Sequence, residues 1–336
     1  MKKLFITFLS ALFVSQFAFA GNIEVLPTMQ SKTTEQDRVW VGTFQLVWND
    51  FMDKFVHDIV KFADVTPETA KELNEQAFLA SDISSNCFYK YAGRVTKNTK
   101  KIIETAIQKK FNEKSDILKN LDMSPDPNKF IIYAMLKKDF KFVQAFDNLG
   151  KSDFKNSKAN YFGITKRSDE LLRDSVTVLF YNSDSDFAVK LNAVGGDEVY
   201  LYKTKCANQF NYIYSDMQKK QNHYNGTAKL ADIDELKIPD LKFFEETEFT
   251  ELEGKRVKGT RLQIDKALET VKFDMNNEGV KLKSEAAMTM LKTALPDTKL
   301  KPRHYYFDDT FVLFLKEKNS SKPYFALRVY DITKFQ

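Results

Sequence analysis

The residues that most often perform catalysis are few and scattered in this chain. The three histidines, His57, His223 and His304, stand far apart, and none has an acid or a nucleophile at a catalytic spacing. No glycine-rich phosphate loop and no HExxH, G-x-S-x-G or CxxC motif occurs. Neighbouring residues of a strand point to opposite faces, so the acid pairs Glu245–Glu246 and Asp308–Asp309 form no dyad. The sequence therefore predicts a protein that is not an enzyme and needs no cofactor, with a hydrolase of dispersed active site as an alternative.

Cysteine chemistry is limited to Cys87 and Cys206. An exported protein could join them in a disulfide, but nothing in the sequence fixes the distance between them, so a bridge and two buried free thiols both stay open. Two cysteines and three isolated histidines do not provide the ligands of a zinc site, so we expect no metal.

A lysine-rich segment near the C-terminus is the clearest candidate for contact with another protein. Two prolines in it discourage strand pairing, so we expect an exposed, extended segment that a protease can cleave. Its basic residues and prolines are Lys292, Pro296, Lys299, Lys301, Pro302 and Arg303.

The residues before this segment alternate as strands do. Val271, Phe273 and Met275 are apolar at every second position, and Asn277-Glu278-Gly279 then provides a turn. Alternation resumes after the turn, with inward positions predicted at Val280, Leu282, Ser284, Ala286, Met288 and Met290. The sequence thus predicts a hairpin that runs into the basic segment.

The rest of the chain reads as helices first and strands later. Apolar residues at helical spacing predict helices over 39–62 and 99–112, and Thr66-Pro67-Glu68 has the composition of a helix start. Residues 21–38 are polar and indicate an extended arm, and 207–232 predict one helix or a loop. Length and β-branching predict strands within 130–143, 174–183, 187–194, 198–205, 235–246, 262–275, 311–318 and 323–333. This order indicates an α+β fold with a helical N-terminal third and large, mostly antiparallel sheets.

Several of these segments together resemble the serpins, a family of protease inhibitors with a mobile bait loop. Glu278-Gly279 and Ser284-Glu285-Ala286-Ala287 resemble the family's acidic, glycine and small-residue hinge. The segments 309–314 and 324–329 resemble its two closing strands, and 238–243 resembles its Leu-Pro-x-Phe strand. Residues 71–83 and 95–103 resemble its mid-chain helices, so that the resemblance spans about 71–333.

The resemblance implies a single serpin-like domain over 21–336 that inhibits a serine or cysteine protease. The bait would be the exposed loop at about 280–303, with Lys292–Thr293 as the cleaved bond counted from the hinge and Lys299–Leu300 counted from the Phe311 strand. The hinge residues would be Glu278, Gly279, Ser284, Ala286 and Ala287, and a protease that prefers basic residues would be the partner.

This chain departs from the family in ways that keep a second function open. The region before the match is shorter than in the family, and the Ser-Pro-x-Ser segment has no counterpart. The leader resembles those of bacteria, so we expect a divergent, bacterial-type member. The hinge holds four additional residues, Val280 to Lys283. A non-inhibitory binding protein with the same fold is therefore the alternative.

The first twenty residues predict an export signal. Lys2 and Lys3 precede an apolar run from Leu4 to Phe19, and Ala18 and Ala20 fit a cleavage site. We expect a mature monomer that begins at Gly21, with no membrane span, in the periplasm or outside the cell. Without Lys2 and Lys3 the net charge falls from +5 to +3, which is too small to indicate nucleic-acid binding.

Overall fold

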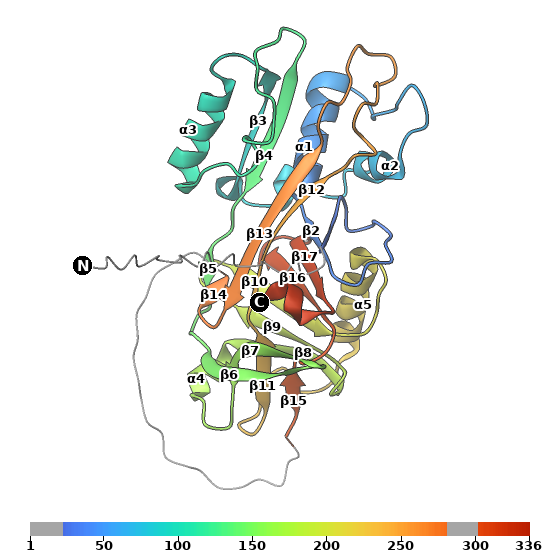
Figure 1. The fold of residues 1–336 in the computed structure, drawn as a ribbon. Coiled ribbons are helices and arrows are strands. Elements are labelled where there is room, and N and C mark those ends of the chain that lie inside the picture. Colours follow the sequence, from blue (N-terminus) through green and yellow to red (C-terminus); the bar gives the residue numbers. More distant parts are fainter. Residues whose placement is uncertain (1–22, 281–301) are drawn as a thin grey trace, which may run out of the picture.

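The computed structural model describes residues 23–280 and 302–336 (Figure 1). Its largest sheet has seven strands, and all but the β1–β2 pair are antiparallel. In spatial order these strands are β1 Glu24–Leu26, β2 Arg38–Val41, β17 Pro323–Val329, β16 Phe311–Glu317, β10 Asp197–Lys203, β9 Asp186–Asn192 and β8 Val176–Ser183.

The centre of this sheet is formed by the last two long strands of the chain. Every residue of β17 and nearly every residue of β16 is buried, as their continuous apolar composition predicts for strands covered on both faces. One cover is α5 Phe210–His223, whose Tyr214 ring lies 5.0 Å from that of Phe314. The main core of the molecule lies here.

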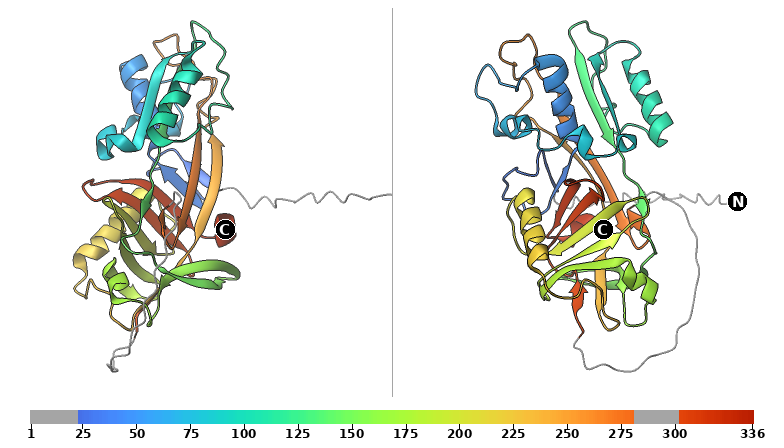
Figure 2. Two further views of the ribbon diagram at one scale, coloured as in Figure 1. Left: turned by 90° about the vertical axis from the view of Figure 1, so that its left-hand side faces the viewer. Right: turned by 180° about the vertical axis from the view of Figure 1, so that it is seen from behind.

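A second sheet packs on the same core. Its order is β15 His304–Tyr306, β11 Glu235–Pro239, β7 Ser157–Ile164 and β6 Asp147–Phe154, and α4 Glu170–Asp174 follows β7 in the chain. Figure 2 shows the β6–β7 hairpin extending from this end of the molecule.

The opposite end holds the elements that frame the candidate site. One unit contains β3 Phe88–Arg94, β4 Phe130–Leu136 and α3 Thr99–Phe111. The other contains β12 Leu241–Glu248 and β13 Leu268–Asn276, which continue through β14 Gly279–Val280 to β5 Phe140–Lys141. In Figure 1, α1 Thr43–Phe51 stands between the α3 unit and α2 Glu68–Asn74.

Two small hydrophobic cores lie at this end of the molecule, whereas the buried apolar side chains of β12 and β13 belong to the main core. Ile103, Ile107 and Phe111 of α3 pack on Ile131 and Tyr133 of β4. The other cluster joins α1 and α2 to residues 249–267. The two clusters are separate from each other and from the main core.

The predicted helices are present with changed limits. The helix at 99–111 is confirmed, and α5 is the helix expected within 207–232. The helix expected over 39–62 begins only at Thr43, because Val39–Val41 belongs to β2, and after a wider turn over Met52–Val56 it ends at His57 with a φ of 59°. Pro67 precedes the first turn of α2 rather than lying within it.

Two other expectations were wrong. Residues 23–38 are not a polar arm, because Ile23, Val25 and Leu26 are buried and β1 pairs with β2. The strand expected over 130–143 breaks at Lys137, so β4 and β5 are separate strands.

Both cysteines are free thiols, and both are half-buried. Among the described residues, none of the helices combines the length and the apolar composition that a membrane span requires.

Candidate functional site

Two strands with open edges face each other across a cavity. In the described chain, β4 pairs only with β3, and β13 pairs with β12 along its whole length but with β14 only at Met275 and Asn276. β13 runs antiparallel to β14, and β14 runs antiparallel to β5, so β13 and β5 are parallel, and β5 follows β4 in the chain. We call the space between β4 and β13 the slot.

The slot is a cavity of about 1260 Å³. Its floor is α1, which contributes Phe44, Trp48 and Phe51. Its walls come from β4, with Tyr133, and from β13, with Glu269. The slot therefore separates the two small hydrophobic cores of this end of the molecule.

The strand β14 closes one end of the slot. Gly279 and Val280 pair with β13 on one side and with Lys141 and Phe140 on the other. Gly279 has a φ of +155°, and a Cβ there would lie 2.4 Å from the carbonyl oxygen of Phe140, so only glycine fits. The carbonyl oxygen of Glu278 accepts a hydrogen bond from the Phe142 amide at 2.9 Å.

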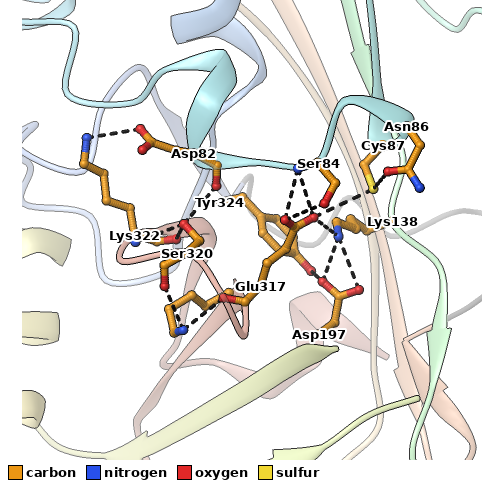
Figure 3. A network of polar contacts seen from close by, with 11 residues as sticks. Asp82, Ser84, Asn86, Cys87, Lys138, Asp197, Glu317, Ser320, Lys322 and Tyr324 are labelled. Atoms are coloured by element: carbon orange, nitrogen blue, oxygen red, sulfur yellow. Dashed lines mark hydrogen bonds and ion pairs between the residues drawn. The ribbon is translucent and has the colours of Figure 1, made fainter. Parts of the chain in front are cut away.

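A buried polar network holds the break between β4 and β5 against the seven-stranded sheet (Figure 3). At its centre, the Lys138 ammonium donates to Glu317 and lies 2.9 Å from an oxygen of Asp197. Burial lowers the pKa of Lys138, but these two carboxylates outweigh burial and raise it. Burial raises the pKa of Glu317, but its contacts with Lys138 and Ser84 bring it below the ordinary value.

The same network involves three further side chains. The Ser84 hydroxyl donates to Glu317 at 2.8 Å, and the buried Tyr324 hydroxyl donates to Asp197 at 3.0 Å. The Cys87 thiol lies 3.9 Å from Glu317, and burial raises its pKa. The β4–β5 junction is thus fixed at a charged, well-connected point.

The most unusual side chain in the slot is Glu269 of β13. It is only 3% exposed, and neither carboxylate oxygen has a hydrogen-bond partner among the described residues. Burial raises its pKa to about 8. The Phe44 amide, in the first turn of α1, faces the carboxyl and moderates this shift without a hydrogen bond of normal geometry. This raised pKa favours the neutral form of Glu269 near pH 7.

Arg303 fixes the C-terminal end of the basic segment. Its guanidinium donates to Asp234 at 2.7 Å and 3.1 Å, and its backbone amide donates to the same carboxylate at 2.9 Å. β15 follows and pairs with β11 in parallel. Residues 281–301 therefore connect two fixed points, β14 and Arg303.

The structure describes two of the predicted site residues, and the sequence reasoning missed one important residue. The Glu278 amide donates to Asn276 Oδ1 at 3.0 Å in the turn before β14, and Gly279 is the first residue of β14. Glu269 escaped notice, although it continues the alternation of Val271, Phe273 and Met275 and so belongs to the inward face. The other predicted site residues lie outside the described residues: Ser284, Ala286, Ala287, Lys292, Thr293, Lys299 and Leu300.

The structure gives contacts for two of the three histidines. His223 Nδ1 lies 2.7 Å from the Lys219 carbonyl oxygen, and His304 Nε2 lies 4.0 Å from Glu235, with its ring 5.0 Å from that of Tyr306. Within residues 23–280 and 302–336 no cluster of His, Cys, Asp and Glu could hold a metal ion.

Solved structures similar in fold to this chain include serpins. Serpin48, a highly specific serpin of the insect Tenebrio molitor, matches with a TM-score of 0.52 and 14% identity over 90% of this chain and 94% of its own. The mouse protein-Z dependent protease inhibitor matches with a TM-score of 0.52 and 12% identity over 88% and 91%. Thyroxine-binding globulin in complex with thyroxine matches with a TM-score of 0.51 and 12% identity over 89% and 94%.

Comparisons at the level of sequence find no such relative. No protein-family model matches the chain. No curated protein matches it either. The structural similarity, at these identities, establishes the fold.

Proposed function

Because the chain has the serpin fold, we propose that it traps a protease with the segment at about 280–303 as bait. The observation that carries this proposal is the slot, a cavity of about 1260 Å³ between the open edges of β4 and β13. Backbone groups at an open sheet edge bind an additional strand through a complete set of hydrogen bonds.

The register of β14 supports its own continuation as the occupant. Met275 is paired with Val280, so a longer strand would bring Leu282 opposite Phe273, and Ala286 opposite Glu269. These are the positions that the alternation of the sequence assigns to the inward face, and Phe273 and Glu269 do face inward. On the other side, continued pairing with β4 would end at Phe130, opposite residue 290. The strand that the alternation of the sequence predicts also ends at Met290.

The proposed reaction begins as ordinary proteolysis. The nucleophile of the protease forms an acyl bond with the carbonyl of Lys292 or Lys299 and releases the amine of Thr293 or Leu300. Because Arg303 stays bound to Asp234, only the part that continues from β14 is free to enter the slot. The acyl-bound protease is then carried along and distorted. We propose an exported monomer acting on a protease that prefers basic residues.

The test is the formation of an SDS-resistant complex with trypsin, using two variants that differ by one position. Ala286→Asp would place a charge opposite the buried acid Glu269, whereas Ala287→Asp would place it on the outward face. Burial of an unpaired charge costs several kcal/mol. We expect the wild type and Ala287→Asp to form the complex and Ala286→Asp to be cleaved without it. Cleavage of the wild type with no complex refutes trapping.

A non-inhibitory binding function is the second candidate. It is favoured by the bulk of Leu282, Met288 and Met290, which must fit between packed strands and would slow their entry. One similar structure is also named for the hormone in its complex rather than for a protease. Unfolding before and after cleavage separates the two functions: a large gain in stability indicates filling of the slot, and no gain favours binding alone.

A further inference from the structure

The slot is bridged by side chains from both of its walls. The segment 112–129, which joins α3 to β4, contributes many of the residues that line it. From this segment, the side-chain amide of Asn120 donates to the carboxylate of Glu246 on β12 at 2.7 Å and 2.8 Å. Lys129, just before β4, lies 3.8 Å from Asp265, just before β13. The two strands therefore begin at the same end of the slot, and the cavity between them is partly enclosed.

The end of the slot where β4 and β13 begin is apolar. Each of the two small hydrophobic cores has half-buried side chains at its margin that also line the slot. From one core these are Phe51, Leu262 and Ile264, and from the other they are Leu121 and Met123. Side chains of this kind are the usual lining of a small-molecule site, because a bound apolar group removes their remaining surface from water.

The opposite end of the slot, near β14, is basic. Lys242 of β12 is opposite Asp274, and Lys272 of β13 is opposite Phe244, so the two lysines are diagonal neighbours on one face of this sheet. Both lysines are exposed and line the slot, and neither ammonium has an ion-pair or hydrogen-bond partner among the residues that the structure describes. Four other lysines of the lining do have carboxylate partners: Lys129, Lys137, Lys138, and Lys266, which pairs with the exposed Glu248 of β12.

The length of β13 sets the size of a molecule that reaches both ends. Asp274, beside the two lysines, is six residues from Leu268, which at about 3.3 Å per residue gives about 20 Å. The cavity of about 1260 Å³ is also larger than the roughly 300–1,000 Å³ of an ordinary ligand pocket. An elongated molecule with one anionic end and one apolar end matches both the shape and the charge of this lining.

We propose that the slot binds a free long-chain carboxylic acid. Its carboxylate lies at Lys242 and Lys272, and its apolar chain extends along β13 toward Phe51 and Leu262. The inference does not rest on the proposed function, because every residue that it uses is described and no strand has to enter the slot.

The test uses the fluorescence of Trp48, which lines the slot, whereas the other tryptophan, Trp40, belongs to the main core. Bromine quenches tryptophan fluorescence at short range. The intact protein is titrated with dodecanoate that carries bromine at the far end of its chain. We expect saturable quenching that is lost in Trp48→Phe and retained in Trp40→Phe. Dodecanoate brominated beside its carboxylate should quench less at saturation, because that end lies at the lysines.

A charge-reversed pair tests the basic end of the slot. Lys242→Glu combined with Lys272→Glu should weaken binding by about tenfold, since both ammonium groups would be replaced by carboxylates that repel the ligand. Lys158→Glu, at an exposed lysine of the β6–β7 hairpin, is the matched control and should bind as the wild type does.

Three results would overturn the proposal. They are the absence of saturable quenching in the wild type, quenching that persists in Trp48→Phe, and equal affinities of the charge-reversed pair and its control. None of them bears on whether an SDS-resistant complex forms with trypsin, so failure of this inference is distinguishable from failure of protease trapping.

Discussion

The buried acid Glu269 should make the intact protein less stable against unfolding as the pH rises. Its ordinary pKa is 4.5, and burial raises the pKa in the folded protein to about 8. Between these values the unfolded chain has released the proton while the folded protein retains it, so unfolding releases a proton and is favoured by higher pH. The stability that the protonated Glu269 contributes to the folded protein is fully present below about pH 4.5. It is lost progressively as the pH rises to about 8.

The size of this effect follows from the two pKa values. One proton changes the unfolding free energy by about 1.4 kcal/mol per pH unit, which gives a loss of about 4 kcal/mol between pH 5 and pH 8. Asp240, whose pKa is also raised by burial, acts in the same direction, and the lowered pKa of Glu317 acts only in more acidic solution. The difference between the wild type and Glu269→Gln therefore isolates Glu269.

The assay is urea unfolding at pH 5, 6, 7 and 8 for the wild type, Glu269→Gln and Glu248→Gln. The amide of the first variant is also buried and unpaired, which shifts its stability by a constant amount at every pH. The pH slope is consequently the quantity to compare. We expect Glu269→Gln to lose most of the slope and Glu248→Gln to retain it. Equal slopes in the wild type and Glu269→Gln would refute the reasoning.

Three other predictions concern the frame of the slot. Gly279→Ala places a Cβ 2.4 Å from the Phe140 oxygen, so β14 should detach from β5 at a cost of about 1–3 kcal/mol, seen as faster hydrogen exchange there; unchanged exchange contradicts this. Lys138→Met leaves the carboxylates of Asp197 and Glu317 without their cation and should lower the free energy of unfolding in urea by about 3–5 kcal/mol. The control Lys158→Met removes an exposed lysine and should lower it by less than about 1 kcal/mol. Equal losses in the two variants would contradict a stabilising role of the Lys138 network. Cys87, whose pKa is raised by burial, should react slowly with iodoacetamide at pH 7.5 and much faster in urea, and rapid labelling of the folded protein counts against the burial of this thiol.

Segments with strong periodicity or continuous apolar composition were predictable from sequence. α3 has apolar residues at helical spacing, and β16 and β17 are runs of buried residues bounded by turns. The β6–β7 hairpin was missed because β6, Asp147–Phe154, is largely exposed and carries small and polar residues without alternation. β1 has three residues, too few to show any period.

The turn between β13 and β14 could be predicted, but the slot could not. Glu278 and Gly279 belong to a local pattern that a few neighbouring residues define. The slot depends on which edges of β4 and β13 stay unpaired, and these strands are more than a hundred residues apart in the chain. The surroundings of Glu269 depend on the same long-range arrangement, because its cross-strand partner is Thr247 of β12 and the Phe44 amide of α1 faces its carboxyl. Local sequence carries no information on such pairings.

The order of strands in the largest sheet has a consequence for biosynthesis. In the seven-stranded sheet, β2 and β10 are joined only through β16 and β17, which a ribosome makes after both of them. Until β16 and β17 emerge, the nascent polypeptide has two groups of strands whose inner edges have no partner. Compaction of this sheet therefore waits for late synthesis, and until then the unpaired edges are exposed to association with other chains.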